Sequence, residues 1–138
     1  MPVSPLQVRN YMSTRFATLS ERQDISEAIT LFTERDLFGA AVLDNLGNMV
    51  GVLSVTDCIG EAIREGFDAG SHRKVSALMS KDVRTVDADD NILDVAKLFM
   101  EGYYRRYPVM EDNRVVGVIT RLEVLKGISK IGRAGVAI

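Results

Sequence analysis

The chain has 138 residues, of which 46% are hydrophobic and 26% charged, as in ordinary globular domains. Its formal net charge of −2 argues against a nucleic-acid binder that works by overall attraction to phosphates. A single Cys58 and a single His72 exclude an intrachain disulfide and argue against a metal site. No apolar run reaches the ~18 residues of a membrane-spanning helix, and the start lacks the apolar core of a secretory signal, so we expect a cytoplasmic protein without membrane contact.

The first half of the chain predicts a strand, a helix, two strands and a second helix. A short strand is expected at residues 17–20, and Asp24 is expected to cap the following helix in a capping box with Glu27. Apolar spacing predicts the buried face of this helix, Ile25, Ala28, Ile29 and Phe32. Residues 40–43 and 49–54 are predicted to pair as antiparallel strands, and the last helix should begin near Asp57 with Ser54 as its N-cap.

The second half repeats this pattern after a connection at residues 64–74, which carries two glycines and mixed charges. Met79-Ser80 answers Met12-Ser13 at a spacing of 67, and after the hairpin turn the spacing falls to 66. The predicted elements are a strand at residues 84–87, a helix capped by Asn91, paired strands at 107–110 and 115–120, and a helix near Glu123 with Thr120 as its N-cap. The apolar face of the capped helix is predicted to comprise Ile92, Val95, Ala96 and Phe99.

These observations predict an α/β (α+β) protein built from two β-α-β-β-α repeats. The first repeat is assigned to residues 1–66, the linker to residues 67–74 and the second repeat to residues 75–138. A three-stranded sheet with helices on one face leaves its other face partly open, and a second copy is the simplest cover. We therefore expect the repeats to pair about a pseudo-two-fold axis.

The order of elements, the duplication and two phrases, VGVLSVTDCI and VGVITRLEVL, resemble the CBS domain family. The resemblance covers residues 8 to about 128 and is that of a stand-alone tandem pair, called a Bateman module; RRYPVMEDNRVVGVIT shows the family pattern well. It implies a regulatory module whose clefts between paired repeats often bind AMP, ADP, ATP or S-adenosylmethionine, although many members bind no ligand. It also implies a homodimer formed through helices, with no cofactor required.

The resemblance places Asp57 and Glu123 at the family's ribose-binding position, although a helix-capping role explains both equally well. Glu123 is longer by one methylene than the usual Asp, so Asp57 is the stronger candidate. The residues that the resemblance implies for the first cleft are Ser54, Asp57, Thr85 and the segment at Tyr103 and Tyr104. Those implied for the second cleft are Thr18, residues 37–39 with Phe38 and Gly39, Thr120 and Glu123.

Phosphate groups would need cations, and Arg105, Arg106 and Arg121 are the candidates; a solvated basic patch is the alternative. The first copy lacks an equivalent of the arginine pair, which predicts two unequal sites. His72, Arg73 and Lys74 form a second basic group in the connection, where a solvated role is expected.

An enzyme is the least favoured class, because no nucleophile stands beside a plausible base and the Asp89-Asp90 pair lies in a loop. Our first hypothesis is a sensor in which a bound ligand shifts the arrangement of repeats or subunits, and an effector protein detects the change. The alternatives are a ligand-free scaffold that regulates a partner through dimerisation, and a nucleic-acid binder that uses the two basic groups.

Overall fold

The computed structural model describes residues 5–65, 73–102 and 104–133. The chain divides into two compact units, which we call the central unit (Ala17–Val83) and the terminal unit (Met1–Phe16 with Arg84–Ile138). Each unit contains one three-stranded sheet, in the order β1-β2-β3 or β4-β5-β6. The fold is therefore the mixed α/β arrangement of two repeated β-α-β-β-α modules that the sequence predicts.

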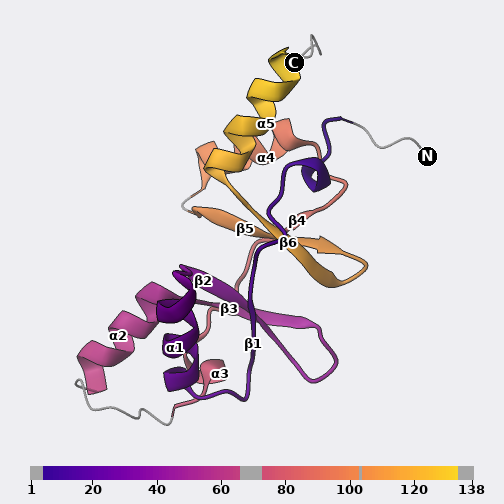
Figure 1. The fold of residues 1–138 in the computed structure, drawn as a ribbon. Helices are drawn as coiled ribbons and strands as arrows, with labels where there is room; N and C mark the ends of the chain where they lie inside the picture. The colour runs from indigo at the N-terminus through magenta and orange to yellow at the C-terminus, as the bar shows by residue number, and fades with distance from the viewer. Residues whose placement is uncertain (1–4, 66–72, 103, 134–138) are drawn as a thin grey trace. The chain divides into compact units, whose positions relative to one another are not determined.

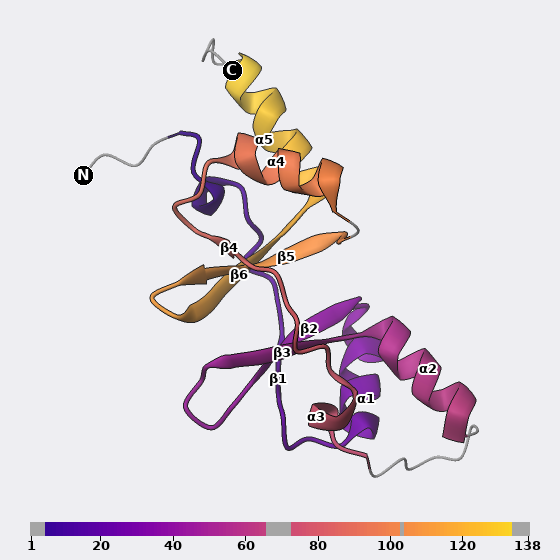
Figure 2. The ribbon, with the colours of Figure 1, turned by 180° about the vertical axis from the view of Figure 1, so that it is seen from behind.

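The central unit begins with β1 (Thr18–Ser20) and α1 (Ile25–Arg35). The hairpin of β2 (Gly39–Leu43) and β3 (Met49–Ser54) leads directly into α2 (Val55–Glu65), and α3 (Val75–Leu78) follows. β1 pairs with β2 in parallel, and β2 pairs with β3 antiparallel. Figures 1 and 2 show α1 and α2 together beside this sheet, where apolar residues from all of these elements form one core.

The terminal unit repeats this topology with β4 (Val86–Asp87), α4 (Ile92–Glu101), β5 (Arg106–Glu111), β6 (Arg114–Thr120) and α5 (Arg121–Arg133), and it adds a short 3-10 helix, η1 (Val8–Asn10). β4 pairs with β5 in parallel, and β5 pairs with β6 antiparallel. The second hairpin turns on Asp112 and Asn113, which both have positive φ, as a tight two-residue turn requires. Both predicted hairpins are confirmed.

Each unit is completed by a segment that precedes the other repeat in the sequence; we call residues 6–13 and 73–80 the crossing segments. Val8 is fully buried in the core of the terminal unit, and Val75 is fully buried in that of the central unit. The Val8 N–H donates to the Asp90 carbonyl (2.9 Å), and the Val75 N–H donates to the Gln23 carbonyl (2.8 Å). The compact units thus divide the chain differently from the sequence repeats, whose assigned boundaries stay a prediction.

The close approach of a crossing segment explains why β3 contains Gly51 and β6 contains Gly117. Val52 pairs with Ser80, and Ser13 pairs with Val118, so each crossing segment lies directly against β3 or β6. A Cβ at Gly51 would lie 2.7 Å from the Ser80 carbonyl oxygen, and one at Gly117 would lie 2.8 Å from that of Ser13. Only glycine admits such a close backbone approach.

The start of α1 differs from the prediction. Asp24 occupies the N-cap position of α1 but makes no side-chain cap hydrogen bond, so the predicted capping box is wrong. Its carboxylate instead binds the Lys74 ammonium at 2.7 Å, in the second crossing segment. Asn91 does cap α4, since its side-chain oxygen accepts from the Leu93 N–H at 2.8 Å.

The buried face of α1 comprises Ile25, Ala28 and Phe32. Ile29, which was predicted to share this face, is 37% exposed because it lies at its edge.

Candidate functional site

Ser54 and Asp57 form a closed hydrogen-bonded pair at the start of α2. Asp57 Oδ2 accepts from both the backbone N–H and the hydroxyl of Ser54, each at 2.9 Å. The Ser54 hydroxyl oxygen in turn accepts from the Asp57 N–H at 3.1 Å. This reciprocal arrangement is the capping geometry that the sequence predicts, and it fixes the orientation of the carboxylate.

Thr120 and Glu123 repeat the arrangement at the start of α5. Glu123 Oε1 accepts from the Thr120 N–H and hydroxyl at 3.0 Å each, and the Thr120 hydroxyl oxygen accepts from the Glu123 N–H at 3.4 Å. The longer side chain of Glu123 therefore curls back to reach the same partner. In both pairs only one carboxylate oxygen is engaged by described residues, so the second oxygen of Asp57 and of Glu123 is available to another donor.

Two of the other candidate residues lie opposite these pairs in the strand ladders. Gly39 lies opposite Ser54 in the β2–β3 ladder, and Arg106 lies opposite Thr120 in the β5–β6 ladder. The candidates in the central unit are Thr18, Phe38, Gly39, Ser54 and Asp57. Those in the terminal unit are Thr85, Tyr104, Arg105, Arg106, Thr120, Arg121 and Glu123. The expected sharing of residues between repeats stays a prediction.

Two aromatic side chains offer flat surfaces at these strand ends. Phe38 is 69% exposed, and its carbonyl accepts from the Val55 N–H at 3.0 Å, which holds it at the start of α2. Tyr104 is 43% exposed, and its ring centroid lies 5.6 Å from that of Tyr107. Exposed rings of this kind can stack on a nucleobase. Tyr103 lies outside the described residues.

Arg105 and Arg106 concentrate positive charge at the start of β5. Partial burial lowers the pKa of Arg106, and the neighbouring Arg105 charge lowers it further. Because both effects disfavour the charged form, an anion bound here would be favoured electrostatically. The central unit has Phe38 and Gly39 in the corresponding place, so the two units differ as the sequence indicates.

The basic group predicted at residues 72–74 is largely neutralised by ion pairs. Arg73 Nη1 lies 2.9 Å from Glu61 Oε2, and Lys74 pairs with Asp24. Glu61 is only 1% exposed, and its Oε1 accepts no hydrogen bond from the residues that the structure describes. Sequence reasoning missed this buried carboxylate, because its partner lies 12 residues away beyond the end of the helix. His72 lies outside the described residues.

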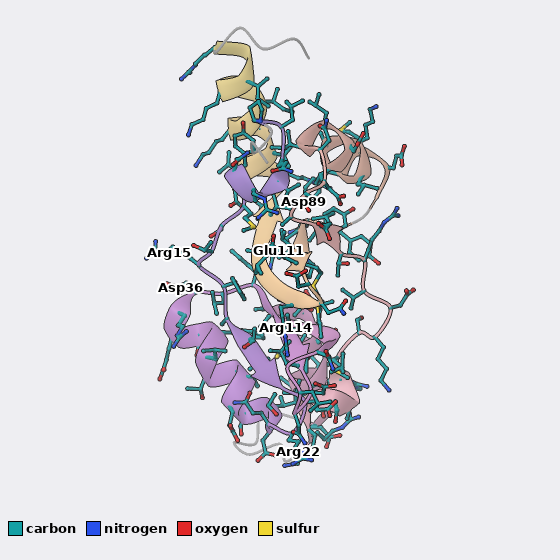
Figure 3. The ribbon with its side chains drawn as sticks, turned by 90° about the vertical axis from the view of Figure 1, so that its right-hand side faces the viewer. Arg15, Arg22, Asp36, Asp89, Glu111 and Arg114 are labelled. Atoms are coloured by element: carbon teal, nitrogen blue, oxygen red, sulfur yellow. The ribbon has the colours of Figure 1, made fainter. Side chains whose placement is uncertain are left out.

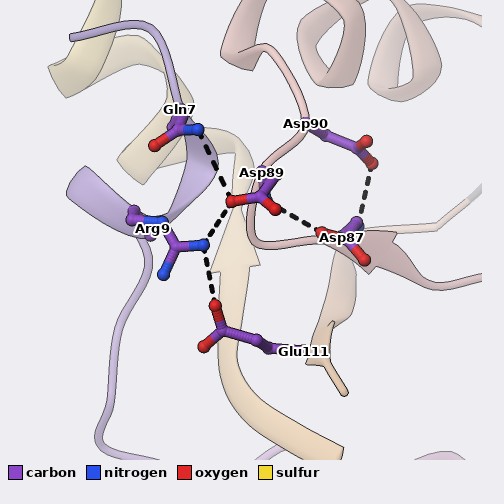
Figure 4. Close-up of polar contacts among 6 residues, drawn as sticks. All are labelled: Gln7, Arg9, Asp87, Asp89, Asp90 and Glu111. Atoms are coloured by element: carbon purple, nitrogen blue, oxygen red, sulfur yellow. Dashed lines mark hydrogen bonds and ion pairs between the residues drawn. The ribbon is translucent and has the colours of Figure 1, made fainter. Parts of the chain in front are cut away.

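An ion-pair network ties the first crossing segment to the rest of the terminal unit (Figure 4), and its acidic members Asp89 and Glu111 are labelled in Figure 3. The Arg9 guanidinium binds Asp89 and also Glu111 Oε1, the latter at 2.7 Å. The hydrogen bond to Glu111 and then that to Asp89 raise the pKa of Arg9. Asp89, which the sequence analysis placed only in a loop, therefore has a structural partner.

Cys58 is buried on α2 next to the candidate site. Burial, with a smaller contribution from the Asp57 charge, raises the pKa of its thiol to about 11. The thiol is therefore neutral at physiological pH, as expected for a packing residue. Within the described residues, no cluster of three or more His, Cys, Asp or Glu side chains is arranged to hold a metal ion. None of the helices in that part of the chain has the length and apolar character to cross a bilayer.

Comparison with known proteins identifies relatives across almost the whole chain. The chain is 35% identical over 113 residues to an uncharacterised protein of Methanocaldococcus jannaschii, covering 81% of this chain and 36% of the relative. It is 28% identical over 112 residues to the CBS domain-containing protein YhcV of Bacillus subtilis, covering 81% of this chain and 78% of YhcV. The chain thus spans only about a third of the length of the archaeal relative.

A solved structure shows the same fold. The crystal structure of CBSX2 in complex with AMP, a CBS-pair protein from Arabidopsis thaliana, matches with a TM-score of 0.77 and 26% identity over 92% of this chain and 98% of that one. The sequence model of the CBS domain matches twice, at residues 8–64 and 75–130. The two matches, the repeated β-α-β-β-α modules and the repeated hydroxyl–carboxylate pair at the start of α2 and α5 agree, and the chain belongs to the CBS domain family.

Proposed function

We propose that this chain is a regulatory module that binds an adenosine-containing ligand, with AMP as the first candidate. Membership of the CBS domain family supports a ligand-binding regulatory role, and the AMP complex of CBSX2, at 26% identity, supports this ligand class. We propose a sensor rather than an enzyme: the ligand changes the arrangement of the module, and an effector protein responds.

The main support for this proposal is the hydrogen bonding of the Asp57 carboxylate. Ser54 holds Asp57 Oδ2, while Oδ1 accepts no hydrogen bond from a described residue. A ribose presents two neighbouring hydroxyl donors, and a fixed carboxylate with unused acceptor capacity suits them. Because the cap has already fixed the side chain, binding costs little further side-chain entropy. Capping and ligand binding are therefore compatible roles for the same residue.

The phosphate and base of the ligand are assigned contacts among the predicted residues. We propose that Arg105 and Arg106 bind phosphate oxygens, since they are adjacent cations and the pKa of Arg106 is lowered. We further propose that Phe38 and Tyr104 contact the base, since both rings are exposed. Thr18, Thr85, Thr120 and Arg121 remain candidate polar contacts.

The decisive test is a calorimetric titration of AMP, ADP, ATP and S-adenosylmethionine into the purified chain and its variants. Asp57→Asn retains a carbonyl oxygen for the cap but loses the charge, and we expect it to weaken AMP binding at least tenfold, or about 1.4 kcal/mol. The matched control is Asp82→Asn, at an exposed residue of the same unit, which should leave affinity unchanged. Equal losses in the two variants would contradict the assignment of Asp57.

Glu123→Gln tests whether the two units differ as binding sites. We expect a smaller loss of AMP affinity than for Asp57→Asn, because the Glu123 carboxylate is carried on a longer side chain. A larger loss would move the principal ribose contact to the terminal unit. Nucleotide absorbance released from the purified protein by denaturant would independently identify a bound ligand.

A second candidate function is a scaffold that acts through homodimerisation, with or without ligand. Large apolar side chains are exposed on the helices of both units: Ile59, Ile63, Leu122 and Leu125. Exposed apolar side chains at helical spacing mark surfaces that bind another protein. We therefore propose a homodimer, which light scattering after gel filtration would detect. No binding of any adenosine compound by a dimeric protein would favour the scaffold.

A further inference from the structure

The two crossing segments bind their units through equivalent backbone hydrogen bonds. Each partner is separated from its counterpart by the repeat spacing of 67 or 66 residues. Because backbone groups are the same in both units, these bonds do not distinguish one segment from the other. In the first segment they join Leu6 to Ile92, Val8 to Asp90, Arg9 to Ala88 and Ser13 to Val118. In the second segment they join Arg73 to Ile25, Val75 to Gln23, Ser76 to Glu21 and Ser80 to Val52.

The apolar contacts of the two segments are equivalent as well. Val8 and Val75 are both fully buried in the core of their unit. The Met12 thioether lies against Gly117 in β6, and the Met79 thioether lies against Gly51 in β3. By its backbone and its apolar side chains, either segment therefore fits either sheet, and any selection between them depends on other side chains.

Arg9 fits the terminal unit and does not fit the central unit. In the terminal unit its guanidinium binds Asp89 and Glu111. The residue of the central unit equivalent to Asp89 is Arg22, 67 residues earlier. The equivalent of Glu111 is Asp44, whose Oδ1 accepts from two backbone N–H groups of its own turn at 2.9 Å each. On the central sheet Arg9 would thus lie beside another arginine, and like charges repel.

The second segment fits only the central unit in the same sense. Its Arg73 binds the buried Glu61 at 2.9 Å, and Lys74 binds Asp24 at 2.7 Å. In the terminal unit the equivalents of these two acids are Gly127 and Asn91, which carry no charge. The segment would therefore lose both of its ion pairs there.

Tyr11 and Glu61 exclude the reverse exchange. The Tyr11 ring packs so closely on α5 that a Cβ on Gly127 would lie 2.9 Å from it. Glu61 occupies the equivalent position of α2, so its side chain would occupy the space that the ring needs. The same exchange would take Arg73 away from Glu61 and leave a buried carboxylate without its main partner, which is strongly destabilising.

We propose that these side chains select which crossing segment occupies which sheet. We call Arg9, Tyr11, Arg73 and Lys74 the pairing residues. They give each sheet one occupant, a defined segment of the same chain, although the repeats share the backbone and apolar contacts that hold it. Without the pairing residues the chain would fold into a mixture in which the two segments are exchanged. Selection here works as much by excluding the wrong segment as by binding the right one.

Exchanging the two segments within the full-length chain tests the proposal. Residues 6–11 (LQVRNY) and 73–78 (RKVSAL) trade places, which keeps both valines and leaves both methionines in position. We expect the melting temperature to fall by at least about 10 °C. A chain with the exchange that melts within about 2 °C of wild type would show that the segments are interchangeable and would overturn the proposal.

Changing the receiving residues separates selection from ordinary loss of contacts. Glu61→Gly combined with Gly127→Glu should lower the melting temperature of the wild-type chain but raise that of the exchanged chain. In the exchanged chain the moved arginine then faces a carboxylate on α5, and the moved tyrosine faces a glycine on α2. Helix propensities offset each other, because glycine only moves from one helix to the other. A lower melting temperature in both chains would overturn the proposal.

Thr14→Lys combined with Lys81→Thr is the matched control. These residues are exposed and equivalent, and they lie directly after the two segments. Their exchange should change the melting temperature by less than about 2 °C. A fall as large as that of the segment exchange would show that any exchange in this region is damaging and would contradict selection by the pairing residues.

Disulfide trapping during refolding measures the pairing directly, and it does not require the exchanged chain to fold. Ser13 pairs with Val118, so Ser13→Cys with Val118→Cys reports the native pairing, whereas Ser13→Cys with Val52→Cys reports the first segment on the central sheet. Cys58 is buried and its thiol pKa is raised, so it does not compete. Under mild oxidation the native link should form at least about tenfold faster.

Removing two pairing residues should open the wrong pairing. Arg9→Ser and Tyr11→Leu introduce the residue types that the second segment has at these positions, and they should speed the link between positions 13 and 52 at least about fivefold. Equal rates for the two links in otherwise wild-type chains would overturn the proposal. An unchanged rate for the wrong link in the Arg9→Ser and Tyr11→Leu chain would overturn it as well.

Discussion

The central and terminal units share one topology, but equivalent positions on α2 and α5 contact the crossing segments through different chemistry. Glu61 on α2 and Gly127 on α5 are 66 residues apart and are equivalent in the repeat. In the central unit the buried Glu61 carboxylate binds Arg73 at 2.9 Å. In the terminal unit the helix approaches Tyr11 so closely that a Cβ on Gly127 would lie 2.9 Å from its ring. Equivalent positions on the two helices are thus used differently: one forms a buried ion pair with the crossing segment, and the other allows a close aromatic contact.

The largest effect is expected from breaking the ion pair in the central unit. Arg73→Met leaves Glu61 buried without its main partner, and we expect the free energy of unfolding to fall by about 3 kcal/mol in urea denaturation. Because a fully apolar pair should pack well, Glu61→Leu combined with Arg73→Met should recover most of this loss. Arg22→Met, an exposed arginine of the same unit, is the control and should change stability by less than about 0.5 kcal/mol. A comparable loss in the control would remove the buried pair as the cause.

The next largest effect is expected at the close approach of a crossing segment to a hairpin glycine, which the two units share. Gly51→Ala and Gly117→Ala each push a methyl group into a crossing segment, and each should cost about 1–3 kcal/mol. Gly60→Ala places a methyl in open space within α2 and should instead add up to about 1 kcal/mol. Thermal unfolding of the three variants gives the ranking. Tolerance of alanine at only one of the two hairpin glycines would show that the crossing segments are not equivalent.

The smallest expected effect concerns the N-terminal ends of α1 and α4, the first long helix of each repeat. Asn91→Ala removes the side-chain cap of α4 and should cost about 1 kcal/mol. Asp24→Ala removes only a partly exposed ion pair with Lys74 and should cost less than that. Adding 0.5 M salt should shrink the difference between wild type and Asp24→Ala but not that for Asn91→Ala. Equal salt responses would mean that Asp24 also acts as a cap in solution.

The order of strands and helices could be predicted because each element has its own local signal. Apolar spacing identified α1 and α4, and alternating strands joined by turn residues identified both hairpins. The crossing segments could not be predicted in this way, since Val8 binds the backbone of Asp90, 82 residues later. Their signature was nevertheless present in the repeated Met-Ser pair and the repeated glycine. In the structure Met79 lies against Gly51 and Met12 lies against Gly117, which explains why the methionine and the glycine recur together.

The candidate site was predictable where local and family signals coincide, as at Ser54 and Asp57. Hydrogen bonds between residues three apart follow from the capping pattern, so their geometry could be anticipated. The Asp24 cap failed for a reason that local patterns do not contain: Lys74, 50 residues away, takes its carboxylate. Glu61 was missed likewise, because burial of a charge depends on a partner brought in by tertiary structure.

The crossing segments also set the order in which a growing polypeptide can complete its parts. Residues 17–83 are contiguous, so the central unit has all its strands and its covering segment once residue 83 has left the ribosome. In the terminal unit, residues 1–16 are synthesised first and can pack only after residues 84–138 have followed. Synthesis therefore completes the central unit before the terminal unit, and a truncated product ending at residue 66 would lack the crossing segment that packs against the β1-β2-β3 sheet.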